Sequence, residues 1–66
     1  MKYFILNTKS ESGDNYTYFI EHPENPSNDE LKRFLLINAN DIEDDYVYEN
    51  IETLIEIPKT FLTIPK

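Results

Sequence analysis

The sequence contains no cysteine, one glycine and one histidine, and each scarcity excludes a kind of chemistry. Without cysteine, disulfides are unavailable and zinc loses its best ligand. One glycine cannot build a phosphate-binding loop, which needs several. A catalytic nucleophile needs a base and an orienting group within reach, and the lone imidazole of His22, directly before Pro23, is typical of a solvated turn residue. We therefore expect no enzyme activity, no cofactor and no metal site.

Basic residues are also few, because six lysines and arginines stand against thirteen aspartates and glutamates, for a formal net charge of −7. Nucleic-acid affinity comes largely from Lys and Arg that displace counterions from phosphate, so we expect no direct binding to nucleic acid or to a membrane. The apolar run near the N-terminus is too short for a signal peptide, and no later run is long enough to span a bilayer. The protein is expected to be cytoplasmic.

Aromatic residues, in contrast, are plentiful, with five tyrosines and four phenylalanines in 66 residues. Disordered acidic chains are poor in such residues, so the composition indicates a folded protein. A chain this short has too little surface to bury in a second core, which predicts a single domain over 1–66. Small domains without disulfides or metals often gain stability from a partner subunit.

The first third of the chain predicts a β-hairpin. Strand-forming residues fill about 2–8 and about 15–21, and the polar segment between them contains Gly13, which can supply the backbone conformation of a tight turn. Two prolines then keep the next segment, 22–26, out of helix.

A helix is predicted directly after this loop, over about 28–38. Ser27 and Glu30 match a capping box, in which the hydroxyl accepts the third helical amide and the glutamate reaches back. Asn38 and Asn40, both tolerant of left-handed backbone, are expected to mark the end of the helix.

The segment 46–57 fits two periodicities. Helical spacing relates Val47, Ile51, Leu54 and Ile55, whereas strand alternation relates Val47, Ile51, Thr53, Ile55 and Ile57, with Glu49 as a polar exception on the same side. The β-branched residues, and Pro58 directly after Ile57, favour a strand over about 50–57. For 41–50 both helix and strand stay open, and any helix here is the short stretch 41–48.

The predicted order is therefore β-β-α-β, a small single-layer α+β domain whose mostly antiparallel three-stranded sheet is covered by one helix. Large apolar side chains point to both faces of this sheet, and one helix covers only one face. The second face is expected to be a contact surface, formed by Phe4, Leu6 and Phe19 or by Tyr3, Tyr16 and Tyr18, according to which face the helix takes. Its cover is either the tail residues Phe61, Leu62 and Ile64 or another chain, since exposed apolar patches usually mark interfaces.

The segment 40–52, NDIEDDYVYENIE, is dense in carboxylates and has three interpretations. Its spacing from Asp41 resembles a calcium loop, but Tyr46 occupies the position where such a loop needs glycine. It can also be solvated connecting chain, which is the interpretation we favour, or a surface that mimics the phosphates of a nucleic acid. The candidate residues for that surface are Asp41, Glu43, Asp44, Asp45, Glu49 and Glu52.

These patterns predict a small acidic protein that acts through protein contacts, without catalytic activity. A homodimer formed through the second sheet face is the simplest version of that prediction. The alternative is an acidic mimic of nucleic acid that inhibits a basic nucleic-acid-binding protein.

Overall fold

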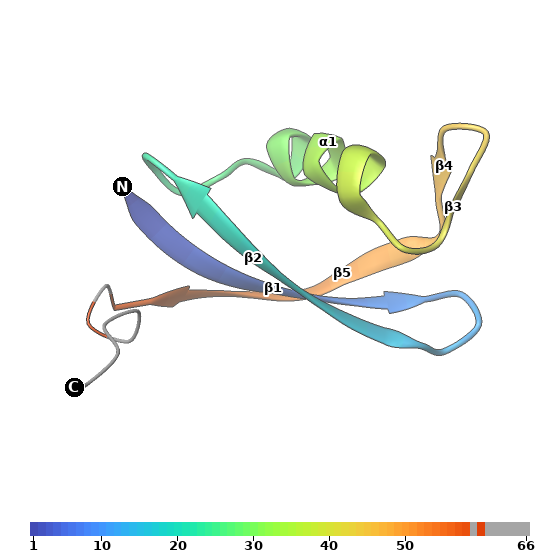
Figure 1. Cartoon of the computed structure of the whole chain (residues 1–66), viewed down its shortest axis with the longest axis horizontal. Coiled ribbons are helices and arrows are strands. Elements are labelled where there is room, and N and C mark those ends of the chain that lie inside the picture. The colour runs from blue at the N-terminus through green and yellow to red at the C-terminus, as the bar shows by residue number, and fades with distance from the viewer. Residues whose placement is uncertain (59, 61–66) are drawn as a thin grey trace.

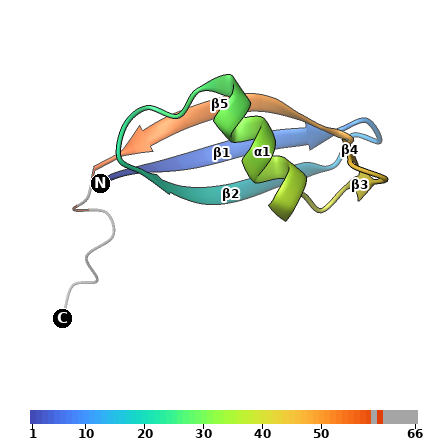
Figure 2. The ribbon, with the colours of Figure 1, turned by 90° about the horizontal axis from the view of Figure 1, so that it is seen from above.

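The computed structural model describes residues 1–58 and 60. Three antiparallel strands form one sheet, in the order β2 (Asn15–His22), β1 (Lys2–Ser10) and β5 (Glu49–Ile57). Helix α1 (Asn28–Asn38) lies across one face of this sheet, and a short hairpin of β3 (Ile42–Glu43) and β4 (Tyr46–Val47) stands beside the helix (Figure 1). Figure 2 shows α1 crossing the three strands obliquely. The predicted small α+β domain with one helix on a three-stranded sheet is confirmed.

The predicted bounds agree closely with the structure. Helix α1 has the predicted limits, while β1 extends two residues further, to Ser10, and β2 one residue further, to His22. Strand β5 begins one residue earlier than predicted, at Glu49.

The turn between β1 and β2 uses the single glycine of the chain. Gly13 has a φ of +97°, a conformation that residues with a Cβ rarely adopt. The amide of Ser10 donates to the carbonyl of Asp14 at 2.8 Å, and the Ser10 hydroxyl accepts from the Asp14 amide at 3.0 Å. These bonds close the hairpin and so set which residues of the two strands face each other.

Helix α1 begins with the predicted capping box. The Ser27 hydroxyl accepts from the amide of Glu30 at 3.2 Å, and the Glu30 carboxylate accepts from the amide of Ser27 at 3.3 Å. The helix ends at Asn38, as predicted, but the next residue, Ala39, is extended, with φ −61° and ψ 145°. The helix therefore ends without the left-handed asparagine that the sequence suggested.

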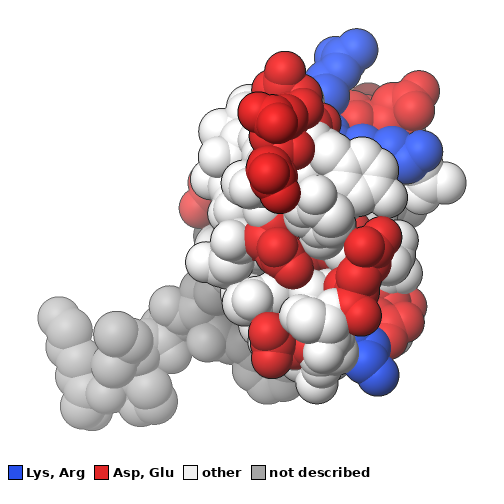
Figure 3. All heavy atoms as spheres, turned by 90° about the vertical axis from the view of Figure 1, so that its right-hand side faces the viewer, with Lys and Arg blue, Asp and Glu red and all other residues white. Residues whose placement is uncertain are grey.

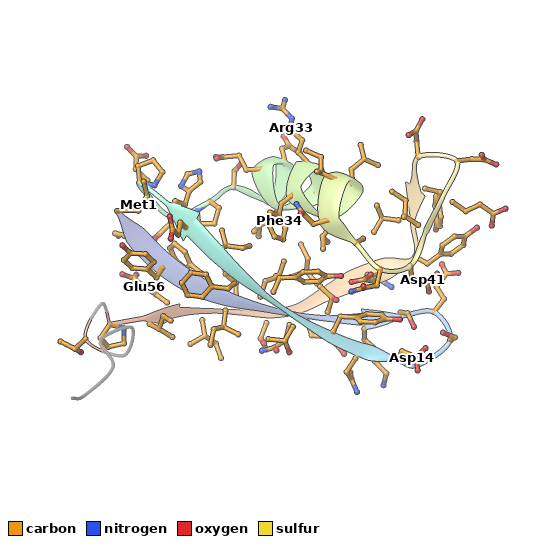
Figure 4. The ribbon with its side chains drawn as sticks, in the orientation of Figure 1. Met1, Asp14, Arg33, Phe34, Asp41 and Glu56 are labelled. Carbon is orange, nitrogen blue, oxygen red and sulfur yellow. The ribbon has the colours of Figure 1, made fainter. Side chains whose placement is uncertain are left out.

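The core lies between α1 and the sheet. Its buried apolar residues are Phe4, Leu6 and Ile20 from the sheet and Leu31 and Leu35 from the helix. Phe34 points from the helix toward the sheet (Figure 4) and meets Tyr18 edge to face, with ring centroids 5.7 Å apart. A core of five buried apolar side chains is small, as expected for a chain of this length.

A β-bulge in β5 divides its side chains between the two faces in a way that strict alternation does not predict. Thr8 of β1 pairs with Ile51 and the preceding residue, Asn7, pairs with Thr53, so Glu52 is an extra residue. Ile51 therefore packs against the core with Leu54, whereas Thr53 lies on the opposite face. The alternation predicted from Val47 through Ile57 is thus wrong, because the bulge reverses its sense at Glu52.

The segment 41–48 is a hairpin rather than a helix. Ile42 pairs with Val47 and Glu43 with Tyr46, and the two residues between them, Asp44 and Asp45, have φ values of 49° and 66°. Positive φ at both central positions is the signature of the two-residue turn that best matches strand twist. Aspartate tolerates this conformation better than most residues do.

Within residues 1–58 and 60, no helix is both long enough and apolar enough to cross a bilayer. The predicted covering role of Phe61, Leu62 and Ile64 falls outside the described residues.

Candidate functional site

The sheet face opposite α1 is uncovered by any other element among the described residues, and one half of it is apolar. Ile5 lies at the centre of this half, paired with Phe19 on β2 and with Ile55 on β5. Five residues form this apolar half, and we call them the open-face patch: Tyr3, Ile5, Phe19, Ile55 and Ile57. Phe19 and Ile55 are 47% and 51% exposed, and the rings of Tyr3 and Phe19 stack with centroids 5.9 Å apart. Contiguous apolar surface of this kind is available for contact with another molecule.

A row of polar side chains crosses the same face and borders the open-face patch. The Thr17 hydroxyl donates to the Asn7 side-chain oxygen at 2.9 Å, and the Asn7 amide group donates to the Thr53 hydroxyl at 2.9 Å. The row links all three strands and satisfies the polar groups of Asn7 from both sides. It confines the apolar area to the end of the sheet where β5 finishes.

Four of the six residues predicted for the apolar contact surface lie on the helix side of the sheet instead: Phe4, Leu6, Tyr16 and Tyr18. The reason is the hairpin register, which pairs Leu6 with Tyr18 and Ile5 with Phe19, because directly paired residues share a face. Both predicted groupings are therefore wrong, since each combined residues from the two faces. Tyr3 and Phe19 remain on the open face.

Glu49, predicted as part of the acidic surface, is buried, with 5% of its surface exposed. One carboxylate oxygen accepts from the hydroxyls of Thr8 at 2.7 Å and Tyr18 at 2.6 Å. The other accepts from the backbone amides of Asn40 at 2.7 Å and Asp41 at 2.9 Å. The carboxylate thus holds the loop after α1 against the sheet, and the prediction of a surface role for Glu49 is wrong.

The electrostatics of Glu49 follow from these four donors. Burial acts to raise the pKa of the carboxyl, but the hydrogen bonds from Tyr18, Thr8 and the two amides favour the ionised form and lower the pKa below its ordinary value. Burial and the bond to Glu49 raise the pKa of the Tyr18 hydroxyl, which also accepts from the side chain of Asn40 at 3.0 Å. With its donors in place, the carboxylate has a structural role.

The other predicted acidic residues remain on the surface, and the structure adds Glu11 to them. The amide of Glu11 donates to the carbonyl of Tyr48 at 3.1 Å, and the Tyr46 hydroxyl donates to the Glu11 carboxylate at 3.3 Å. These contacts bring the turn between β1 and β2 beside the β3–β4 hairpin. Figure 3 shows acidic groups gathered on this end of the molecule. The contacts of Glu11 with Tyr46 and Tyr48 and the pairing of the hairpin bring together the set that we call the acidic end: Glu11, Asp41, Glu43, Asp44 and Asp45. Glu52 is exposed on β5.

The carboxylates of the acidic end do not converge on one point. Asp44 and Asp45 form the tip of the hairpin, whereas Asp41 uses its backbone to bind Glu49 and Tyr48. Among the described residues, no three side chains of the His, Cys, Asp and Glu types are grouped so as to hold a metal ion. The spacing that resembled a calcium loop belongs to a β-hairpin in this fold.

Comparisons with protein-family models, with curated protein sequences and with solved structures find no match to this chain.

Proposed function

We propose that the protein is an interaction module that binds protein through the open-face patch, with self-association as its simplest form. The observation that supports the proposal is the position of five apolar side chains on a sheet face that no other described element covers, two of them about half exposed. Monomeric proteins rarely expose contiguous apolar area of this kind unless it contacts a partner. The stacked pair of Tyr3 and Phe19 gives the patch rigid aromatic groups, which lose little conformational freedom on binding.

Face-to-face packing of two copies is the arrangement that this patch suits. Two sheets pack about 10 Å apart when their side chains interdigitate, and Ile5, Phe19 and Ile55 lie side by side across the three strands. The formal charge of −7 on each copy opposes association at low ionic strength. Screening by salt should therefore strengthen self-association, because the attractive term is apolar and the repulsive term is electrostatic.

The test is the mass of the protein in solution at high micromolar concentration, measured by light scattering or sedimentation. We expect a mass approaching that of a dimer, a monomeric mass for Phe19→Asn and Ile55→Asn, and an unchanged dimer for the control Ile37→Asn. Ile37 is 82% exposed on α1, so its replacement removes a similar side chain from a different surface. A wild-type protein that stays monomeric at these concentrations overturns self-association.

The same measurement distinguishes a second copy from the C-terminal residues as the cover of the patch. If residues 61–64 cover it, the double variant Phe61→Asn, Leu62→Asn will expose the patch and increase association. If a second copy covers it, the double variant will associate as the wild type does.

A second candidate function is mimicry of nucleic acid by the acidic end, as an inhibitor of a basic nucleic-acid-binding protein. The supporting observation is that the fold joins Glu11 to the acids of the hairpin, which concentrates charge from two distant segments. Binding of that kind weakens steeply with salt, opposite to the effect expected for self-association.

Affinity capture of basic proteins with a salt elution step tests the mimicry. We expect retention by the wild type, loss for Asp44→Asn with Asp45→Asn, and no loss for the charge-matched control Glu21→Gln with Glu24→Gln. Asparagine tolerates the positive φ of the turn, so the hairpin is preserved. Equal loss in both double variants would indicate a general charge effect and contradict a defined site.

A further inference from the structure

A cleft of about 390 Å³ lies on the helix side of the sheet, between α1, the β3–β4 hairpin and the first residues of β5. Its apolar lining comes from Leu35 and Leu36 on the helix, Val47 on the hairpin and Ile51 on β5. Leu36 is 40% exposed, so part of this lining faces solvent. The volume and the apolar character are those of small binding sites. Because the open-face patch lies on the other side of the sheet, the cleft is independent of the self-association proposed above.

The helix rim of this cleft carries two adjacent cations, Lys32 and Arg33. The described part of the chain has four lysines and arginines in all. The two outside the cleft are Lys9 on β1 and Lys2, whose ammonium group lies 4.0 Å from the carboxylate of Glu56. Among residues 1–58 and 60, neither Lys32 nor Arg33 forms an ion pair. In Figure 4, Arg33 projects from α1 away from the sheet.

Two carboxylates also line the cleft, and they define where an anionic ligand can lie. Glu49 stays ionised, but both of its carboxylate oxygens already accept two internal hydrogen bonds, so it offers no free acceptor to a ligand. Asp45 lies on the hairpin wall, opposite the helix. An anionic group is therefore favoured at the helix rim and disfavoured at the hairpin wall, where an N–H donor fits better.

The third wall belongs to β5, which is an outer strand of the sheet. Beyond it, no further strand pairs among the described residues (Figure 2). Asn50 and Ile51 line the cleft on this strand, so backbone groups of an outer strand lie beside an apolar cavity. Grooves between a helix and an outer strand accept extended peptides, which gain affinity from main-chain hydrogen bonds and specificity from side-chain pockets.

We propose that the cleft binds an extended, acidic peptide segment of a partner protein. One large aliphatic side chain of the peptide occupies the cavity above Ile51, and an Asp or Glu side chain meets Lys32 and Arg33. The charge complementarity is specific to this part of the molecule, because the other described residues include thirteen aspartates and glutamates and only two lysines, Lys2 and Lys9.

The test uses two synthetic peptides, acetyl-Val-Glu-Leu-Glu-Val-amide and the same peptide with lysine at both glutamates. Titration into the full chain, followed by backbone amide shifts, should give saturable changes at 32–36 and 45–51 for the acidic peptide and much weaker binding for the basic one. In Lys32→Gln with Arg33→Gln we expect affinity for the acidic peptide to fall roughly fivefold to tenfold, since each exposed ion pair is worth little. Both positions are exposed on α1, so the fold should be retained.

The matched controls are Lys9→Gln, which removes a cation from another surface, and Phe19→Asn, which alters the open-face patch. Neither should change the affinity, and a peptide response that survives in Phe19→Asn separates this proposal from the function proposed above. Equal binding of the two peptides, or equal loss in Lys9→Gln, would overturn the proposal. Saturable binding of octanoate at the affinity of the acidic peptide would also overturn it, in favour of a small aliphatic acid as the ligand.

Discussion

The two faces of the sheet are built from the same three strands, yet within residues 1–58 and 60 only one of them forms a core. On the helix side, Phe4, Leu6 and Ile20 are almost fully buried beneath α1, whereas on the open side Phe19 and Ile55 keep about half of their surface in water. A helix with its side chains is about 10 Å wide, which suffices to cover one face of three strands and no more. Stability is therefore concentrated on the helix side, and the open side can change at small cost to the fold.

The sharpest way to test this difference is to compare neighbouring residues of β1. Leu6 is fully buried, with an exposed fraction of 0%, while Ile5 lies in the open-face patch. Leu6→Ala should reduce the free energy of unfolding by about 3 kcal/mol, from lost transfer energy and the cavity left behind. A domain of this size has only about 3–10 kcal/mol in total, so this variant will be close to unfolded.

Ile5→Ala is the matched control in this comparison, because it shortens a similar side chain on the same strand. We expect it to cost less than about 1.5 kcal/mol, since its side chain already contacts solvent. Urea denaturation followed by circular dichroism, at low protein concentration where association is negligible, measures both values. Equal costs would show that the open face is covered in the free protein.

The second comparison concerns two glutamates of β5. Glu49 is buried among four donors, whereas Glu56 makes an exposed ion pair with Lys2. In Glu49→Gln, an NH₂ group replaces one of the two carboxylate oxygens, and that group cannot accept a hydrogen bond. At least two buried donors therefore lose their acceptor. We expect a loss of about 2–3 kcal/mol, against less than about 1 kcal/mol for Glu56→Gln.

Hydrogen exchange distinguishes the cause of that loss from a general weakening of β5. In the wild type, the amides of Asn40 and Asp41 donate to Glu49, and we expect them to exchange slowly although both follow the end of a helix. In Glu49→Gln their protection should fall more than that of the central strand β1. Uniform loss of protection across the sheet would contradict a role for Glu49 in holding this loop.

How much of this arrangement could be predicted depends on how local its causes are. The capping box of Ser27 and Glu30 and the turn at Gly13 are set by neighbours in the chain, and both are found where the sequence placed them. The turn at Asp44 and Asp45 could also have been predicted from the local sequence, because aspartate tolerates positive φ and strand-forming residues flank the two aspartates.

The features that were not predicted depend on distant residues. The bulge at Glu52 adds one residue without any change in composition, so alternation along β5 cannot reveal it. Glu49 is stable in a buried position only because four donors from β1, β2 and the loop after α1 converge on it. The open-face patch needed the hairpin register, which pairs Ile5 with Phe19, and alternation within a single strand does not supply that register.

The smallest expected effect concerns the junction between the sheet and the helix, where His22 at the end of β2 pairs with the carboxylate of Glu30 in the first turn of α1. The hydrogen bond to Glu30, with that to the Glu24 carbonyl, raises the pKa of His22 above its ordinary value of 6.5. The same contact lowers the pKa of Glu30 below its ordinary value of 4.5. His22, which the sequence suggested to be a solvated turn residue, is instead the last residue of β2 and pairs with Glu30.

The sign of the pH dependence follows from these two shifts. The stabilisation from His22 is fully present below pH 6.5 and is lost as the pH rises through the raised pKa of His22. The stabilisation from Glu30 is present above pH 4.5 and is lost as the pH falls through the lowered pKa of Glu30. His22→Gln should thus lower the melting temperature slightly between pH 4.5 and 6.5, and the difference from wild type should vanish at alkaline pH. Glu30→Gln is a poorer probe, because Glu30 also completes the capping box. An NMR titration of the His22 ring that gave a pKa at or below 6.5 would remove the basis for this prediction, and both proteins would then share one pH profile.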